Sequence, residues 1–239
     1  MHLLFENDAC LVINKRPGES SELPELGLAK RVSFPVPVHR LDTPVSGCLL
    51  LAKNARAAAF LAAAFARNTS LEGQGGVEKR YWAVVEMPAV PIPQEAELVH
   101  WLKKDNKKNK SFALSCNNVQ AVPEGLKRRL KKAKLYYRVI GSGERYLFLE
   151  IGLITGRHHQ IRAQLAAEGL FIKGDLKYGA RRSEKGGGIR LHAYSLAFPN
   201  PLNPPETILV KAPLQEPDSL WQSFLNQKLR LRADDVTQS

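Results

Sequence analysis

The stretch HRLDTPVSGCLLLAKN, residues 39–54, decides the fold, because it joins a polar loop to a continuous apolar run that has the length of a buried strand. The Ala-rich segment that follows, residues 55–68, has high helix propensity throughout, so we expect a helix that packs closely on the sheet. The polar loop holds Asp42. An aspartate in a loop flanked by proline and glycine is usually a turn former, and a chemical role for Asp42 therefore needs further support.

Outward from this stretch, strand-like runs outnumber helices. Two strands around a Glu-Asn-Asp turn are predicted in residues 3–18, and hairpins in 96–115 and 135–156. Residues 158–169 and 216–228 have the apolar spacing of helices. Most consecutive strands are joined by turns too short for a crossover helix. We therefore predict an α+β fold with a largely antiparallel mixed sheet and flanking helices.

The chain is basic. Lys and Arg number 35 against 23 Asp and Glu, which gives a formal charge of +12 and favours a polyanionic partner. Three basic segments stand out, at residues 103–110, 127–134 and 173–190. Any one of them is most simply a solvated face. If folding brings all three to one side, they form a groove for phosphates, and binding should weaken steeply with salt.

Composition also bounds the setting of the protein. The three cysteines are odd in number and far apart, which favours a reducing cytoplasm over a disulfide framework. Neither a signal peptide nor an apolar run near the ~20 residues of a membrane span is visible. His158, His159 and His192 lack accompanying ligands at metal spacing, so we expect no metal. We expect one domain over residues 1–239, with a frayed tail at 233–239.

The residues themselves permit chemistry at a nucleoside. A reaction at the sugar carbon that holds a base needs a carboxylate in reach, because such a group can attack, stabilise positive charge or take a proton. Asp42 is the candidate, and Arg162 could hold it bidentately and keep it ionised. Tyr81 would stack on a base and use its hydroxyl in proton transfer. From residue types alone, a turn, a helix surface and a sheet ring are the simpler readings of these three positions.

The order of several motifs changes that balance. They are HRLD at 39–42, EKRYWAVVE at 78–86, GRHHQIR at 156–162, GDLKYG at 174–179 and RLHA at 190–193. Taken together they resemble the RluA-type pseudouridine synthases, which isomerise uridine inside RNA. The resemblance runs from about residue 11 to about residue 213. It is specific because the motifs occur in the family's order.

The resemblance implies roles for individual residues. Asp42 matches the family's catalytic Asp, and Arg40 resembles the side chain that helps to displace the flipped nucleotide. Tyr81 matches the active-site Tyr of the K-x-Y strand, Arg162 the Arg that pairs with the Asp, and Leu191 an apolar position that shapes the base pocket. The neighbouring motif positions are candidate substrate contacts: His39, His159, Gln160 and Lys177.

The sequence also departs from the family. Val45 stands where the family usually has Thr, and Gln164 where a His often follows the HQIR motif. These changes affect substrate details rather than the proposed Asp, Tyr and Arg. Ahead of Leu11 there is no room for the S4-like RNA-binding domain of many relatives, so recognition is expected to rest on the catalytic domain and its basic loops.

The implied reaction begins when the uridine leaves its stack, because the glycosidic bond cannot be reached inside a paired helix. Asp42 then assists cleavage of that bond, and the uracil turns in the pocket and reattaches through a ring carbon. Attack of Asp42 on the sugar and removal of a sugar proton both remain open. No cofactor or metal is needed. The expected partner is ribosomal or transfer RNA, not DNA or a membrane, and the expected state is a monomer.

Two other classes compete with this interpretation. A non-catalytic RNA-binding protein accounts for the charge, and it predicts that Asp42→Asn leaves all activity intact. A nucleoside hydrolase or glycosylase would use a carboxylate at the same bond. It would release free base, so detection of free uracil after incubation with RNA would favour it.

Overall fold

The computed structural model describes residues 2–22, 36–67, 76–115, 118, 120 and 122–237. The strands are β1 (His2–Glu6), β2 (Cys10–Lys15), β3 (Val36–Pro37), β4 (Ser46–Ala52), β5 (Glu78–Glu86), β6 (Glu95–Asp105), β7 (Lys110–Leu114), β8 (Lys131–Ser142), β9 (Tyr146–Leu153), β10 (Leu191–Asn200) and β11 (Asn203–Lys211). The helices are α1 (Ala55–Ala66), α3 (Glu124–Lys127), α4 (Gln160–Ala167) and α5 (Ser219–Thr237), with 3-10 turns η3 (Leu176–Tyr178) and η4 (Lys185–Gly187).

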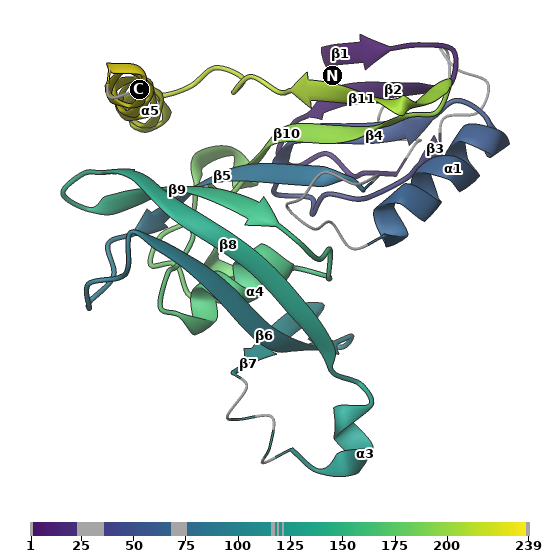
Figure 1. Cartoon of the computed structure of the whole chain (residues 1–239). Coiled ribbons are helices and arrows are strands. Elements are labelled where there is room, and N and C mark those ends of the chain that lie inside the picture. The colour runs from purple at the N-terminus through teal and green to yellow at the C-terminus, as the bar shows by residue number, and fades with distance from the viewer. Residues whose placement is uncertain are drawn as a thin grey trace.

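The described strands form one 11-stranded sheet (Figure 1). Its order is β1-β2-β4-β10-β5-β9-β8-β6-β7, with β11 beside β10 and β3 beside β4. The pairing of β4 with β10 is parallel, whereas the other strand pairings are antiparallel. The predicted α+β fold with a largely antiparallel mixed sheet is therefore confirmed.

Successive side chains of β4 point to opposite faces of the sheet, and a helix packs on each face. Leu49 and Leu51 share a buried cluster with Ile161 and Leu165 of α4. The intervening Leu50 belongs to the cluster on the opposite face, where α1 packs. The predicted helix over 55–68 corresponds to α1, whose N-terminus is capped because the Asn54 side chain accepts a hydrogen bond from the Ala57 amide at 2.8 Å. Residue 68 lies outside the described residues.

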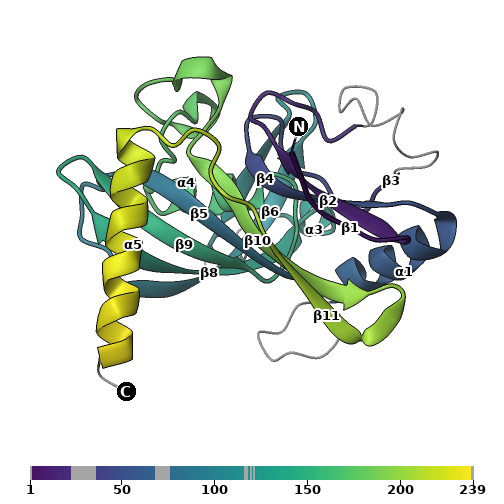
Figure 2. The same ribbon diagram turned by 90° about the horizontal axis from the view of Figure 1, so that it is seen from above.

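The last helix, α5, crosses the sheet over β5, β9 and β8 (Figure 2). Trp221 and Phe224 are buried against this face, as predicted. The helix is longer than expected, because it continues to Thr237, through most of the segment 233–239 that we assigned to a frayed tail. The segment from Leu225 to Ala233 is rich in Leu, Gln, Lys, Arg and Ala, which are strong helix formers and favour continuation.

The parallel contact between β4 and β10 brings the first motif, HRLD, close to the last, RLHA. Gly47 has a φ of +115°, and a Cβ at this position would lie 2.3 Å from the carbonyl oxygen of Ala193. Only glycine permits this close approach. As a result, the loop that carries Asp42 enters the sheet directly beside the strand that begins at Leu191.

Among the described residues, no helix is both long and apolar enough to cross a membrane. In the same part of the chain, His, Cys, Asp and Glu side chains form no group of three or more that could hold a metal ion. His192, one of the three histidines considered as ligands, hydrogen-bonds Ser46 at 2.8 Å and the carbonyl of Ala212 at 3.0 Å. Its ring therefore links β10 to its neighbours.

Candidate active site

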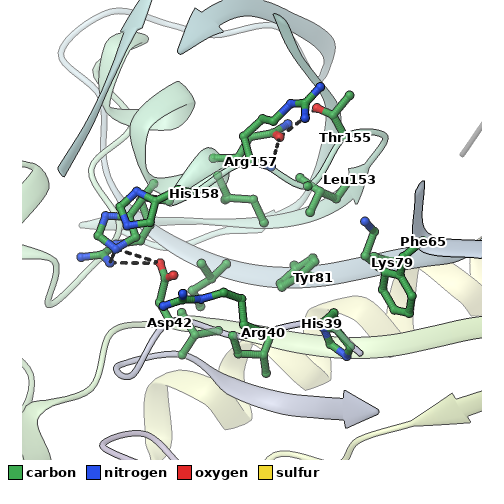
Figure 3. Close-up of a pocket in the computed structure, with 18 of the residues that line it drawn as sticks. His39, Arg40, Asp42, Phe65, Lys79, Tyr81, Leu153, Thr155, Arg157 and His158 are labelled. Carbon is green, nitrogen blue, oxygen red and sulfur yellow. Dashed lines mark hydrogen bonds and ion pairs between the residues drawn. The ribbon is translucent and has the colours of Figure 1, made fainter. Parts of the chain in front are cut away.

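A cavity of about 520 Å³ lies where the β3–β4 loop, β5 and the start of α4 meet (Figure 3). Eight of the nine residues predicted to act in catalysis or substrate binding line it. They are His39, Arg40, Asp42, Tyr81, His159, Gln160, Arg162 and Leu191. The ninth, Lys177, is exposed and lies outside the cavity lining; its ammonium donates to the carbonyl of Asn109 at 3.3 Å, in the turn between β6 and β7.

The loop that carries Asp42 is held by backbone hydrogen bonds. The amide of Val45 donates to the carbonyl of Asp42 at 2.9 Å, and the amide of Gly18 donates to the carbonyl of Thr43 at 2.8 Å. The fully buried Lys15 also donates to Thr43 at 3.1 Å and to two carbonyls of the turn after β2. Lys15 thus ties the Asp42 loop to the β2 turn, which sequence reasoning had not foreseen.

Arg162 makes the predicted pair with Asp42, across 120 positions of sequence, with its Nη1 at 3.1 Å from Oδ2. The prediction that it holds Asp42 bidentately is wrong. The bidentate partner is Asp175, reached by Nε at 2.7 Å and Nη2 at 2.8 Å. Burial alone would lower the pKa of Arg162, but the bonds to Asp175, together with the charge of Asp42, raise it above its usual value.

His159 and Tyr178 complete the surroundings of Arg162. The His159 Nε2 lies 3.2 Å from the Arg162 Nη1 and its Nδ1 lies 3.0 Å from the Tyr178 hydroxyl. Burial, followed by the charge of Arg162, lowers the pKa of His159 to about 3, so the ring is neutral. Since a guanidinium can only donate, Nε2 accepts and Nδ1 donates to Tyr178. The Tyr178 ring also lies 4.9 Å from the Arg162 guanidinium carbon.

Asp175 and Tyr178 are the functional candidates that sequence reasoning missed. Both belong to GDLKYG, a motif of which only Lys177 was predicted to have a role. Asp175 is 2% exposed and Tyr178 is 5% exposed. A buried aspartate requires a charged or multiply donating partner, and this rule, applied to an Asp within an otherwise recognised motif, was the available signal.

Gln160 and His39, like His159 and Lys177, have hydrogen bonds within the protein. The Gln160 Oε1 accepts from the Thr155 hydroxyl at 2.8 Å and the Arg157 amide at 3.0 Å, while its Nε2 donates to the carbonyl of Lys134 at 3.1 Å. The His39 Nε2 accepts from the Leu50 amide at 3.0 Å. These bonds shape the walls of the cavity.

Tyr81 and Leu191 form the apolar side of the site. Tyr81 is 7% exposed, and burial, followed by the nearby charge of Asp42, raises the pKa of its hydroxyl well above the usual range. Leu191 is 3% exposed at the first position of β10. Of the two departures from the family pattern, Val45 lines the cavity, whereas Gln164 packs toward β6 and donates to the carbonyl of Leu98 at 3.0 Å.

The first two basic segments lie side by side, because β6 pairs with β8 in a register that places Lys132 opposite Trp101. We call residues 103–110 and 127–134 the basic lobe; it includes the lower ends of β6, β7 and β8, next to α3, in Figure 1. Its exposed cations form no ion pair with described residues and are Lys104, Lys107, Lys108, Arg128, Arg129, Lys131 and Lys132.

The third basic segment, residues 173–190, is partly paired with carboxylates of the protein. Lys173 and Arg190 both form ion pairs with Glu184, and Arg190 also bonds Asp218. Lys177 and Arg182 of the same segment are exposed, and Lys177 bonds the carbonyl of Asn109 in the basic lobe, so the third segment adds part of its charge to the lobe.

Comparison with known proteins assigns the class. Residues 10–167 match the family model of RNA pseudouridylate synthases. The chain therefore belongs to the RNA pseudouridylate synthase family, in its RluA-type branch.

Individual relatives agree with this assignment. An uncharacterised RNA pseudouridine synthase of Zymomonas mobilis is 32% identical over 164 residues, which cover 68% of this chain and 66% of the relative. A tRNA pseudouridine synthase C of Haemophilus ducreyi is 30% identical, with 95% of each chain covered. A ribosomal large subunit pseudouridine synthase C of Vibrio parahaemolyticus is 28% identical, with 89% of this chain and 65% of the relative covered.

Coverage of the first relatives is partial. The aligned region spans 66% of the Zymomonas protein and 52% of an uncharacterised RNA pseudouridine synthase of Bacillus subtilis. The solved structure of human RNA pseudouridylate synthase domain containing 4 shares the fold, with a TM-score of 0.68 at 22% identity and 97% and 93% coverage of the two chains.

Proposed function

We propose that this protein is an RNA pseudouridine synthase that isomerises uridine in ribosomal or transfer RNA. One observation carries the proposal. Asp42 reaches Arg162 through Oδ2, and its Oδ1 has no hydrogen-bond partner among the described residues. A carboxylate oxygen is therefore available in the cavity while its partner oxygen is oriented by a guanidinium that Asp175 holds in turn.

The geometry supports separate roles for the residues of the cavity in the reaction. The flipped uridine enters the cavity with its ribose at Asp42 and its base against the ring of Tyr81. Asp42 acts on the sugar while the bond from ribose to ring nitrogen breaks. The side chains of Tyr81 and Leu191 then hold the detached uracil while it turns, so that a ring carbon can bond to the sugar and no base is lost. That carbon gives up its proton, and the ring nitrogen released from the sugar gains one, so the reaction is an isomerisation.

RNA held outside the cavity is proposed to contact the basic lobe. The lobe adjoins the cavity, since Lys104 belongs to both and the Arg157 Nε donates to the carbonyl of Lys132 at 3.3 Å. Its cations suit phosphates, which are the dominant contacts in most RNA and DNA complexes. We name both ribosomal and transfer RNA as candidate substrates, because the Vibrio relative is named for the ribosomal large subunit and the Haemophilus relative for tRNA.

The remaining expectations extend the same proposal. We propose a cytoplasmic monomer with one catalytic domain, without DNA, membrane or metal partners. Cys10 and Cys48 are free buried thiols, which is compatible with a reducing compartment, while Cys116 lies outside the described residues.

The test is to incubate unmodified ribosomal and transfer RNA transcripts with the wild-type protein and with Asp42→Asn, and then to map pseudouridine and to assay free uracil. We expect pseudouridine at one or a few sites with the wild type, none with Asp42→Asn, and no free uracil from either. Release of uracil would favour a glycosylase. An Asp42→Asn protein as active as the wild type would refute the role of the carboxylate.

A further inference from the structure

The cavity has a cationic end on the far side of Tyr81 from Asp42. Lys79 precedes Tyr81 by two residues on β5, so both side chains project from the same face of the strand. In Figure 3, Asp42 and Lys79 lie on opposite sides of Tyr81, and Lys79 stands beside Phe65 and His39. This end of the cavity is not needed to explain how Asp42 is held.

The ammonium of Lys79 is enclosed and has no counter-ion among the residues that the structure describes. Its Nζ lies 5.6 Å from the centroid of the Phe65 ring, and a Cβ placed on Gly156 would be 3.3 Å from it. Within the described part of the chain, the ammonium of Lys79 forms neither a hydrogen bond nor an ion pair. Burial lowers the pKa of Lys79 to about 8, which reflects the cost of a desolvated, uncompensated charge.

The described residues that line the cavity do not offer the missing negative charge. Of the described residues that line the cavity, Asp42 is the one carboxylate, and Arg162 already binds it. Arg40, Lys104 and Arg157 add further positive charge to the lining. A cavity with this balance attracts an anionic ligand.

We propose that the Lys79 end of the cavity binds a phosphate of the RNA strand next to the target uridine. The inference rests on the proposed function, because it assumes that the strand is RNA with a uridine at Asp42. A phosphate carries the full charge that compensates the ammonium, and lysine is a common phosphate ligand. A carbonyl of the uracil is neutral and would leave the charge largely uncompensated, so a contact with the base is the competing outcome.

The first experiment measures salt dependence without turnover. Binding of a single-stranded oligouridylate of ~12 nucleotides, within the usual site size, is measured in the Asp42→Asn background at several salt concentrations. Each phosphate contact to a single strand adds about 0.7 to the slope of log K against log salt. We expect Lys79→Gln to lower the slope by about 0.7, and Lys79→Arg to retain it.

Lys211→Gln is the matched control, because Lys211 is an exposed lysine on β11 that does not line the cavity. It removes the same charge and should keep the parental slope. An unchanged slope with weaker binding in Lys79→Gln would indicate a base contact and overturn the proposal. Unchanged slope and affinity would overturn it as well.

The second experiment uses the unmodified protein, so it does not depend on the folding of a variant. Acetylation of Lys79 is followed by mass spectrometry with oligouridylate or with uridine nucleoside, which has base and ribose but no phosphate. Protection by the oligomer alone supports the phosphate site, whereas equal protection by the nucleoside refutes it. Failure of the wild type to form pseudouridine would refute the proposed function and leave both binding results standing, so the two failures are distinguishable.

Discussion

Replacing Asp175 by Asn tests whether the buried Asp175–Arg162 pair positions the carboxylate of Asp42, which we propose to be catalytic. The substitution keeps the size of the side chain and removes its charge. An asparagine can accept only one of the two hydrogen bonds that Arg162 now donates, and its NH₂ group would face a guanidinium N–H. The side chains of Arg162 and Asp175 are 6% and 1% exposed, so water cannot replace the lost bond.

Breaking a buried pair by removing one partner costs about 3–5 kcal/mol. We expect the lower end, about 3 kcal/mol, because Arg162 keeps its bond to Asp42 at 3.1 Å. A loss of this size lies within the 5–15 kcal/mol stability of typical domains, so the variant should fold. Without both hydrogen bonds to residue 175, the guanidinium of Arg162 is held less precisely against Asp42. A misplacement of ~1 Å lowers kcat by roughly 100-fold.

The measurements are urea unfolding and pseudouridine formation in single turnovers at a temperature where both proteins are folded. Asp218→Asn is the control, since Asp218 also pairs with an arginine, Arg190, but is 49% exposed. Asp218 caps α5 by accepting from the Trp221 amide at 3.1 Å, and asparagine caps equally well. The control should lose less than ~1 kcal/mol and keep its activity. If Asp175→Asn matches Asp218→Asn in stability and rate, the positioning argument is wrong.

Two further predictions concern His39 and Tyr81. Burial, followed by the charge of Lys79, lowers the pKa of His39 to about 3, below the usual 6.5, so the unfolded chain binds the extra proton first as the pH falls. Between pH 7 and pH 5, protonation of His39 in the unfolded chain lowers the free energy of unfolding by about 2 kcal/mol. His39→Gln should remove this loss, as measured by urea unfolding at both pH values. An equal loss in the variant would contradict the lowered pKa of His39. Tyr81→Leu removes the ring proposed to stack on the base, a contact of ~1–3 kcal/mol, so RNA affinity should fall ~5- to 150-fold. Tyr81→Phe keeps the ring and should keep the affinity. An unchanged affinity in Tyr81→Leu would exclude stacking.

Local sequence patterns were sufficient to predict most of the secondary structure. The apolar run after Asp42 becomes β4, the Ala-rich segment becomes α1, and the Lys- and Asn-rich turn joins β6 to β7, because burial and propensity act within a few residues. The candidate site was predictable to the extent that motif order placed Asp42, Tyr81 and Arg162 in one family pattern. Residue types alone did not favour that interpretation.

Where a polar side chain could bind more than one partner, the tertiary structure decided which partner it binds. Arg162 offers five N–H groups and can bind either of two carboxylates bidentately, and only the packing of α4 against η3 gives that position to Asp175. In the same way, Glu184 pairs with both Lys173 and Arg190, and the side chain of Gln160 forms its hydrogen bonds within the protein.

The sequence by itself therefore determined the elements of this protein, their order and the chemical types present at the site. Which donor meets which acceptor, and which cations stay without a partner, depended on distances between segments far apart in the chain. Hydrogen bonds and ion pairs form only within a few ångströms. Separations on that scale are set by the packing of the whole sheet, as at the contact of Gly47 with Ala193, and no local pattern encodes them.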